Sequence, residues 1–507
     1  MLPFDIKDLL LAPRLDRQQV AALLSPYGFT DAAKADANLQ ALAADPSDRQ
    51  LVANILQDLL TCVSNSADPD QALNFFERFA RAALNKVQLL SYLQQSPQAL
   101  DILVRTLGAS PYMAEILIRD PQHFYWVSDP HVLHSRRKKR DIHHELARTL
   151  RVLEAEQSQL DYLRVVKRRE MLHIGVRDLL RLCSVEQTLS ALSVLAEALI
   201  TMAYWICSSA LRRQYNLPKN AFTGFTILGM GKLGGEELNF SSDVDLIYLY
   251  ASEAEQANSI TARDYFRRLA QKISTGLNDF TGEGYVYRVD LRLRPEGEAG
   301  YIAYPLAGYE RYYRSRLSTW ERLALLKAWP VAGNRVLGRA FLDMVRRFIY
   351  DEGLDDKALG DIRMMKSKID QQMMLRDQRS RNVKLGTGGI REIELIAQSL
   401  QVRYGSEIPQ IRQRNTLTAL AALCEHTLLS REECDILTHA YIFLRDVENK
   451  LQMANDAQTH SLPRDEKELT VVARTLGHDG ADGFLREYHR QTGEVNRIFE
   501  SHFSEST

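Results

Sequence analysis

The sequence predicts an α+β protein that is helical over most of its length and carries one small mixed sheet near its middle. Two observations lead to this prediction. Apolar residues recur at helical spacing on both sides of the central region. Within that region the order is strand, glycine turn, strand, helix, strand. We therefore expect an N-terminal helical domain at 1–185, a sheet-containing domain at 186–335 and a C-terminal helical bundle at 336–507.

The N-terminal domain is predicted to be a series of helices joined by short breakers. Residues 44–48 and 64–70 are rich in Asp, Asn, Ser and Pro, which favour turns. Ser110-Pro111 is a predicted helix start, because serine caps a helix and proline suits its first turn. The basic run at 134–140 is expected to be a solvated loop, and the alternative is contact with an acidic partner or phosphate.

The sheet-containing domain is expected to open with a buried helix at about 186–211. The uncharged stretch 198–211 within it is too short to span a bilayer. Residues 226–229 form a short apolar strand, and the glycine-rich loop 229–239 leads to a second strand that begins near Asp243.

A helix and a third strand complete the predicted sheet domain. Residues 261–279 are amphipathic, with apolar residues at four-residue intervals: Tyr265, Leu269, Ile273 and Leu277. Residues 284–295 alternate between apolar and polar, which predicts a half-buried strand. Helices dominate again beyond about 336, and a glycine loop at 387–390 opens one of them.

The chemistry is predicted at the second and third strands. Asp243 and Asp245 are two residues apart, so in a strand they point to the same face. Two adjacent carboxylates repel each other unless a cation lies between them, and Mg²⁺ (or Mn²⁺) with its preference for oxygen ligands is the expected cation. Asp290 is a third candidate ligand for a two-metal site, with Arg292 and Arg294 on the same strand face as candidate phosphate ligands.

Simpler explanations exist for each part of this pattern. An isolated Asp-x-Asp is common in turns and at helix N-termini, and the arginines could pair with Asp290 or with nearby glutamates. The coincidence of a glycine turn, a same-face carboxylate pair and a second strand with Asp among Arg favours the metal site. The expected nucleotide-binding residues lie in the turn and on the third strand: Gly231, Lys232, Gly234, Gly235, Ser242, Arg292 and Arg294.

Composition narrows the possible functions. The formal net charge of −1 gives no general attraction for nucleic acid, so a nucleic-acid partner is not expected. The five cysteines are dispersed, which is typical of reduced thiols. The first residues lack the basic and apolar segments of a secretion signal, so a cytoplasmic protein without a membrane anchor is expected.

These motifs resemble the glutamine synthetase adenylyltransferase family (glutamate-ammonia-ligase adenylyltransferases), among the nucleotidyltransferases of polymerase β-like fold. In that superfamily a Gly-Ser turn precedes Asp-x-Asp and a later Asp. Gly231-Lys232 stands in the Gly-Ser position, with Lys in place of Ser, and Asp290 matches the third carboxylate. Three further segments resemble the family: 320–327, 382–394 and 443–452.

The resemblance implies a function and partners. Family members have two halves, one of which attaches AMP to a tyrosine of glutamine synthetase while the other removes it. Residues 237–243 and 384–392 are most similar to the removing N-terminal half, which implies phosphorolysis by inorganic phosphate with release of ADP. The family also implies a nitrogen-regulatory signalling protein and glutamine as effectors.

Three alternatives remain open at the level of sequence. The same site could run adenylylation from ATP. A catalytically silent regulatory module is disfavoured by the intact Asp243, Asp245 and Asp290, and an RNA nucleotidyltransferase by the near-zero net charge.

Overall fold

The computed structural model describes residues 5–12, 15–218, 220–351 and 356–503. Contacts divide the chain into two compact units that are each built from separated segments. Unit 1 comprises Met1–Ser135, Met171–Ser184 and Asn449–Glu487, and unit 2 comprises Arg136–Glu170, Val185–Glu448 and Tyr488–Thr507. The three-domain division at 185 and 335 remains a prediction.

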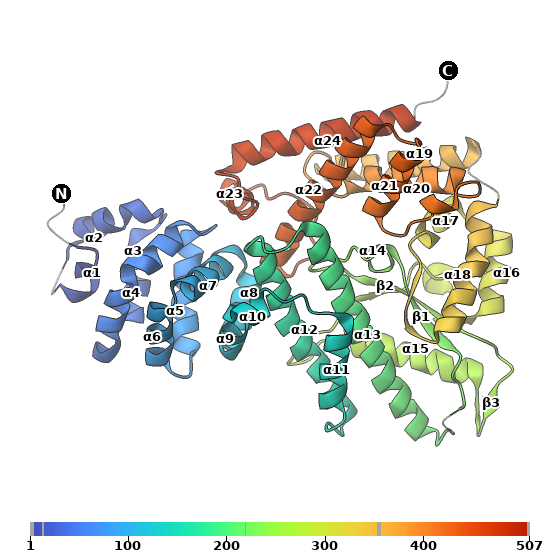
Figure 1. The fold of residues 1–507 in the computed structure, drawn as a ribbon, viewed down its shortest axis with the longest axis horizontal. Coiled ribbons are helices and arrows are strands. Elements are labelled where there is room, and N and C mark those ends of the chain that lie inside the picture. Colours follow the sequence, from blue (N-terminus) through green and yellow to red (C-terminus); the bar gives the residue numbers. More distant parts are fainter. Residues whose placement is uncertain (1–4, 13–14, 219, 352–355, 504–507) are drawn as a thin grey trace. The chain divides into compact units, whose positions relative to one another are not determined.

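Unit 1 is built of helices, and capping residues in the sequence predict where several of them start. An Asp or Ser followed by Pro precedes several of them, and at α8 the Ser110 hydroxyl accepts a hydrogen bond from the Met113 amide at 3.1 Å, as predicted. In Figure 1 these helices are drawn in blue to cyan: α1 (Asp8–Leu11), α2 (Arg17–Leu24), α3 (Ala32–Leu42), α4 (Pro46–Ser64), α5 (Pro69–Ala82), α6 (Lys86–Gln95), α7 (Pro97–Ala109), α8 (Pro111–Arg119), α9 (Gln122–Ser128) and α10 (Pro130–Leu133). The later segment α23 (Glu466–Thr475) also belongs to unit 1.

Unit 2 holds the sheet. Its central strand β2 (Val244–Tyr250) runs antiparallel to β1 (Phe225–Gly229), which runs antiparallel to β7 (Trp329–Gly333). The free edge of β2 is shared by two short parallel strands, β5 (Val289–Asp290) beside its start and β6 (Ala303–Pro305) beside its end. A separate hairpin joins β3 (Gln256–Ala257) to β4 (Ile260–Thr261).

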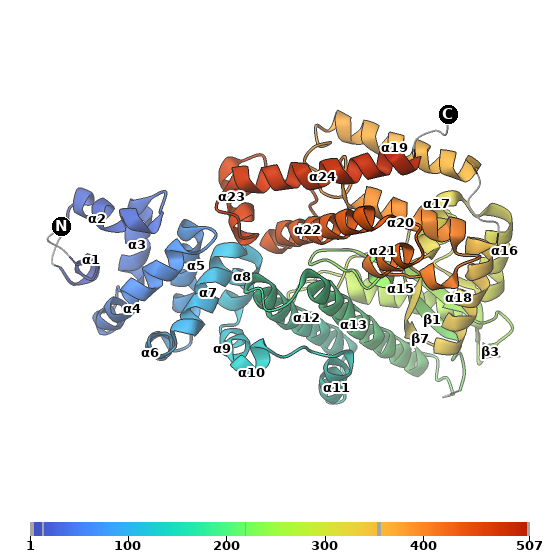
Figure 2. The ribbon, with the colours of Figure 1, turned by 45° about the horizontal axis from the view of Figure 1, so that its top comes forward.

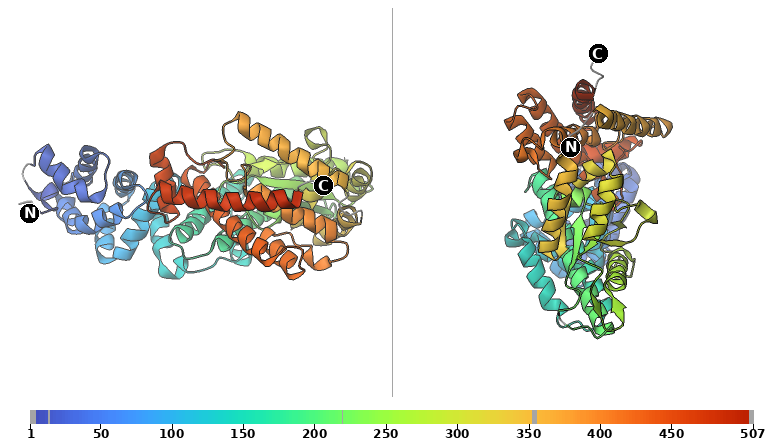
Figure 3. Two further views of the ribbon diagram at one scale, coloured as in Figure 1. Left: turned by 90° about the horizontal axis from the view of Figure 1, so that it is seen from above. Right: turned by 90° about the vertical axis from the view of Figure 1, so that its right-hand side faces the viewer.

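Helices cover the sheet and hold its core. α13 (Val185–Gln214) packs against α15 (Ala262–Asn278) and β7, α11 (Lys139–Leu150) packs along α13, and α18 (Arg335–Tyr350) packs on β1 and β7 (Figures 1 and 2). Figure 3 shows α16 (Leu306–Arg316) and α18 side by side. The remaining helices of this unit are α14 (Gly231–Gly234), α17 (Thr319–Leu325), α19 (Asp356–Leu375), α20 (Ile390–Tyr404) and α21 (Thr416–Glu425); α12 (Glu156–Leu179), α22 (Arg431–Asn455) and α24 (Ala481–Phe503) contribute to both units.

The α+β class and the order of strand, turn, strand, helix and strand are confirmed, with one correction. The third strand, expected over 284–295, has only two residues, Val289 and Asp290. It ends early because the Asp290 carboxylate accepts the Arg292 amide at 2.8 Å and a turn follows, closed by Arg294 N–H to the Leu291 carbonyl at 3.2 Å. The alternation of apolar and polar residues therefore led to a strand prediction that was too long, because residue types can also alternate in a turn.

The helix α13 matches the predicted buried helix but is more apolar than expected. By length and composition alone it could cross a membrane, which the short stretch 198–211 did not indicate. However, 56% of its most apolar window is buried, and it packs against α15 and β7 as a core helix does. Its hydrophobicity is therefore explained by the core of unit 2.

The core of unit 2 depends on an aromatic cluster, and its removal should be costly. Phe266 on α15 is 1% exposed and stacks on Phe225 and Tyr250, with ring centroids 5.4 and 5.1 Å away. We predict that Phe266→Ala lowers the free energy of unfolding by about 3–5 kcal/mol. The control Phe280→Ala removes a ring that is 80% exposed and should cost far less. Chemical denaturation measures both, and equal losses would contradict this view of the core.

Candidate active site

The structure brings the predicted carboxylates to the start of β2. Asp245 on β2 and Asp290 on β5 are directly paired in register on neighbouring parallel strands, and Asp243 immediately precedes β2. Burial raises the pKa of Asp245 to about 7, and the negative charges of Asp290 and Asp243 add to the shift. The three carboxylates are therefore close enough to repel one another.

The glycine turn lies directly against this group. Gly231 has φ +51, and a Cβ at this position would lie 2.8 Å from Oδ2 of Asp245. The Met230 amide donates to the main-chain carbonyl of Asp245 at 2.9 Å. Glycine is needed at 231 because a side chain would be both strained and in contact with the carboxylate.

The two later glycines serve a different contact. A Cβ on Gly234 would lie 1.7 Å from the Lys327 carbonyl oxygen, and one on Gly235 would lie 3.1 Å from that of Arg414. These glycines let the loop pack tightly against neighbouring backbone. Their expected role in nucleotide binding remains a prediction.

Arginines form ion pairs with Asp243 and Asp290, two of the three carboxylates. Arg288 Nε donates to Asp243 Oδ1 at 2.7 Å, and Arg292 Nε donates to Asp290 Oδ2 at 2.9 Å. Burial alone would raise the pKa of Asp290, but the hydrogen bonds from the Arg292 side chain and amide lower it below its ordinary value. Arg294, in contrast, donates to the backbone carbonyls of Leu291, at 2.8 Å, and Glu298, at 3.2 Å.

The donor set suits a divalent cation, although it is not arranged as a finished metal site. Among the described residues, no group of three His, Cys, Asp or Glu side chains is placed so that it could hold a metal ion. The reason is visible at Asp243 and Asp290, whose oxygens face arginines. Asp245, whose pKa is raised by burial and then by the charges of Asp290 and Asp243, adds a third carboxylate to a set of oxygen ligands of the kind that Mg²⁺ prefers.

Lys232 in the glycine turn is largely buried. Its ammonium group pairs with the fully buried Glu448 of α22 at 2.7 Å. Burial lowers the pKa of Lys232 to about 7 in spite of Glu448, and the nearby charges of Lys384 and Arg445 contribute. The neighbouring Ser242 accepts a long hydrogen bond from the Asn239 amide at 3.4 Å.

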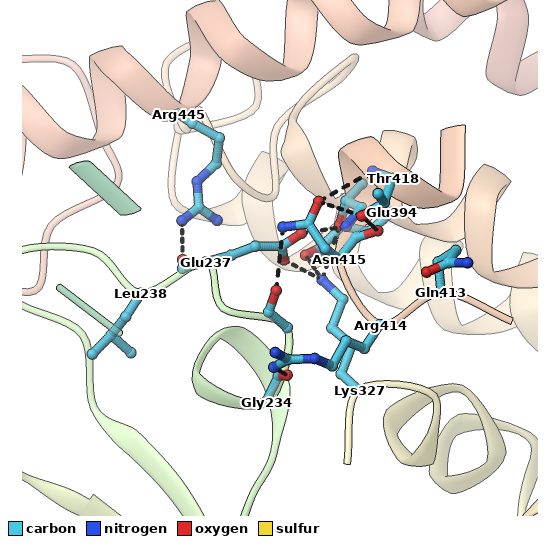
Figure 4. Close-up of polar contacts among 12 residues, drawn as sticks. Gly234, Glu237, Leu238, Lys327, Glu394, Gln413, Arg414, Asn415, Thr418 and Arg445 are labelled. Atoms are coloured by element: carbon cyan, nitrogen blue, oxygen red, sulfur yellow. Dashed lines mark hydrogen bonds and ion pairs between the residues drawn. The ribbon is translucent and has the colours of Figure 1, made fainter. Parts of the chain in front are cut away.

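Behind the glycine loop lies a buried ionic cluster, which we define as Glu237, Asn239, Lys327, Glu394, Arg445 and Glu448 (several are drawn in Figure 4). The Lys327 ammonium lies between two carboxylates, 2.7 Å from Glu237 and 2.9 Å from Glu394. Arg445 donates to the Glu237 carbonyl and to the Asn239 side chain, and Asn239 donates to Glu448 at 2.7 Å. The cluster fastens the loop to the turn that precedes β7, through Lys327, and to α20 and α22.

Arg414 and Asn415 add a second set of contacts to the same loop. Arg414 donates to the Gly234 carbonyl and pairs with Glu236 at 2.8 Å, and Asn415 donates to the Gly235 carbonyl at 3.2 Å (Figure 4). The loop is thus held from behind along most of its length.

The cluster contains two residues, Arg445 and Glu448, that the sequence did not suggest as site residues. Together with Lys327 and Glu394 they lie in the three later segments that carried the family resemblance, 320–327, 382–394 and 443–452. The family resemblance therefore marked these segments, but local sequence spacing does not show that they meet in the fold.

Two other arginines are engaged in ion pairs. Arg391 pairs with Glu394 at 3.4 Å, and Arg168 pairs with Glu283.

The basic run at 134–140 is partly neutralised within its own unit. Arg137 pairs with Glu145 at 2.5 Å, Lys139 with Glu197 at 2.8 Å and Arg140 with Asp141 at 3.8 Å. Intramolecular carboxylates therefore already balance much of its charge.

A small mixed sheet, a glycine turn against an Asp-x-Asp strand and a third Asp on the neighbouring parallel strand define the class of nucleotidyltransferases. The comparisons agree with this class. Residues 100–344 match the model of glutamate-ammonia ligase adenylyltransferase, and residues 363–503 match that of GlnD PII-uridylyltransferase.

Curated relatives lead to the family itself. A Thioalkalivibrio sulfidiphilus protein is 37% identical to this chain over a match that covers 80% of the chain and 42% of the relative. A Brucella melitensis protein is 35% identical, and the match covers 82% of the chain and 43% of the relative. A Xanthomonas campestris protein is 42% identical, and the match covers 60% of the chain and 33% of the relative. Each is named a bifunctional glutamine synthetase adenylyltransferase/adenylyl-removing enzyme. The chain belongs to the glutamate-ammonia ligase adenylyltransferase family and matches less than half the length of these relatives.

The charge on Asp245 should destabilise the protein when no cation is present. The pKa of Asp245 is raised to about 7, so the folded protein favours the neutral acid and stability falls as pH rises from about 4 to about 7. We predict that Asp245→Asn is more stable than wild type at pH 8 without divalent cations, by on the order of 1–3 kcal/mol. The difference should shrink as pH falls toward 4.

Adding Mg²⁺ completes this test. A saturating ion, at a hundred times its Kd, adds about 2.7 kcal/mol to wild type and less to Asp245→Asn. Thermal denaturation with and without Mg²⁺ measures both effects. Asp343→Asn, at an exposed ion pair, is the control and should behave as wild type. Equal stabilisation of all three proteins by Mg²⁺ would exclude Asp245 as a ligand.

The buried cluster predicts a second stability effect. Lys327→Met leaves Glu237 and Glu394 without their shared cation, which should cost about 3–5 kcal/mol. Lys272→Met is a matched control, because Lys272 pairs with Glu156 at 2.8 Å in a half-exposed position and should lose at most about 1 kcal/mol. Adding Glu237→Gln and Glu394→Gln to Lys327→Met should recover part of the loss in urea titrations. No recovery would mean that uncompensated charge is not the cause.

Proposed function

We propose that this chain is a metal-dependent nucleotidyltransferase that removes AMP from an adenylylated tyrosine of glutamine synthetase, using inorganic phosphate and releasing ADP. The observation that carries the proposal is the register pair Asp245 and Asp290 on adjacent parallel strands, with Gly231 packed against Asp245. Membership of the adenylyltransferase family supplies the substrate class. A cytoplasmic location is part of the proposal.

In the proposed site, the carboxylates bind the metal, and the arginines and the backbone of the glycine turn bind phosphate. Asp243, Asp245 and Asp290 would hold Mg²⁺ (or Mn²⁺), which when bound neutralises phosphate charge during transfer. Arg288 and Arg292, which now neutralise Asp243 and Asp290, would be released toward phosphate oxygens, which guanidinium groups bind well. The backbone around Gly231 lies close enough to the carboxylates to approach the bound phosphates.

The direction of the reaction is inferred from two segments. Residues 237–243 and 384–392 resemble the removing half of the family, and both contribute to the surroundings of Asp245. Lys384 supplies a positive charge near Asp245 and Lys232. Adenylylation from ATP is the second candidate, because the names of the relatives include both activities.

Regulation through the C-terminal helices is also part of the proposal. Residues 363–503 match a PII-uridylyltransferase model, which supports a link to nitrogen signalling through a regulatory protein and glutamine. The described residues of α19 to α22 and α24 are the place to seek such effects, because α20 and α22 hold the glycine loop through the buried ionic cluster.

A paired assay separates the two directions. The chain is mixed with adenylylated glutamine synthetase, phosphate and Mg²⁺, and separately with unmodified synthetase, ATP and Mg²⁺. We predict ADP release in the first mixture and little AMP transfer in the second. Asp243→Asn and Asp245→Asn should each lower turnover by at least a hundredfold, because one metal carboxylate is lost.

The exposed Asp343→Asn serves as the control in this assay and should retain wild-type turnover. Transfer from ATP without ADP release would reverse the proposed direction. Full phosphorolysis by Asp245→Asn would remove the site assignment.

A further inference from the structure

One arginine connects a proposed metal carboxylate to a tyrosine of the chain itself. Arg288 donates through Nε to Asp243 Oδ1 at 2.7 Å and through Nη1 to the Tyr285 hydroxyl at 2.7 Å. Its Nη2 donates to the Ser241 carbonyl at 2.6 Å and to the Ser241 hydroxyl at 3.0 Å. The planar group is thus fixed by three residues, and the phenol of Tyr285 is held beside the carboxylate site.

The separation is short enough for chemistry. Two hydrogen bonds and the width of a guanidinium separate the Tyr285 oxygen from Asp243, which amounts to roughly 5–7 Å. A nucleophile attacks from about 3–3.5 Å. A phosphoryl group lying beside Asp243 would therefore be near attacking distance of the Tyr285 hydroxyl once Arg288 turns toward the phosphate.

Two cationic side chains lie near the ring of Tyr285. The Lys167 ammonium lies 4.3 Å from the centre of the Tyr285 ring, and the Arg288 guanidinium lies 5.4 Å from it. Neighbouring cations stabilise negative charge that develops on the phenol oxygen as its proton leaves. The ring is half-buried, so these cations are only partly screened by water.

We propose that Tyr285 is an internal acceptor of AMP, so that this chain adenylylates and deadenylylates itself at that residue. The inference rests on the proposed function, because it uses the same site and the same tyrosine chemistry. The Tyr285 oxygen attacks the α-phosphorus of an adenine nucleotide and forms an O–P bond. The bond from that phosphorus to the bridging oxygen breaks, phosphate leaves from ADP or pyrophosphate from ATP, and the phenolic proton passes to solvent.

The reverse step restores the enzyme. Inorganic phosphate attacks the phosphorus, the bond to Tyr285 breaks, ADP leaves and the phenolate takes a proton. While it is attached, the AMP lies beside the carboxylates, at the place that the tyrosine of the partner protein must reach. Self-modification would therefore inhibit the enzyme, and phosphate would relieve the inhibition.

Intact mass measurement of the full chain tests the proposal directly. The chain is incubated with Mg²⁺ and either ADP or ATP, and the modified residue is then mapped by peptide sequencing. We expect one AMP per chain on Tyr285, which added phosphate removes with release of ADP. Tyr285→Phe should reduce the label at least tenfold, and Asp245→Asn should also prevent it.

Tyr287→Phe is the matched control. Tyr287 lies two residues away, is 4% exposed and also has Lys167 near its ring, at 5.2 Å, so its loss should leave the label unchanged. Both glutamine synthetase reactions are run on the same preparation. A label elsewhere, a label that survives Tyr285→Phe, or no label from an enzyme that turns over the synthetase would overturn the inference and leave the proposed function standing. If the chain gives no label and turns over the synthetase in neither direction, both the self-modification at Tyr285 and the proposed function are refuted.

Discussion

The Lys327 ammonium, enclosed between Glu237 and Glu394, is the interaction on which the rest of the site depends. Burial opposes charge on Lys327 and Glu394, yet the carboxylates raise the pKa of Lys327, and its ammonium holds the pKa of Glu394 well below its ordinary value. Lys327 and Glu394 are therefore ionised together. Because Glu237 follows the glycine loop directly, this contact fixes the rear of the loop and so the position of Gly231 against Asp245.

The same arrangement explains why a helical region far along the chain belongs to a site on the sheet. α20 supplies Glu394 and α22 supplies Arg445 and Glu448, which bind the loop through its backbone and through Asn239. A nucleotidyltransferase core of short strands has little area with which to hold a glycine-rich loop. Buried charges from the C-terminal helices supply the missing contacts, and directional ion pairs specify one loop position better than apolar packing would.

The sequence allowed the class of fold and the three carboxylates to be predicted, because both depend on local spacing. Asp243 and Asp245 needed only the two-residue period of a strand, and α15 only its four-residue apolar pattern. The prediction of a strand over 284–295 was wrong, because the Asp290 carboxylate accepts a hydrogen bond from the Arg292 amide and the strand ends after two residues. The pairing of Lys232 with Glu448 spans 216 positions, and no local pattern reports a contact of that range.

The attachment of the glycine loop to its neighbours also determines which parts of the site can respond to a ligand. Since the backbone around Gly231 to Asn239 is fastened to neighbouring segments, we expect a ligand to be met by exchange of the ion pairs of Arg288 and Arg292 rather than by movement of this backbone. Side-chain rotations of this kind take picoseconds to nanoseconds, whereas lid loops move in microseconds to milliseconds. Ligand binding at such a site would then need no slow loop closure.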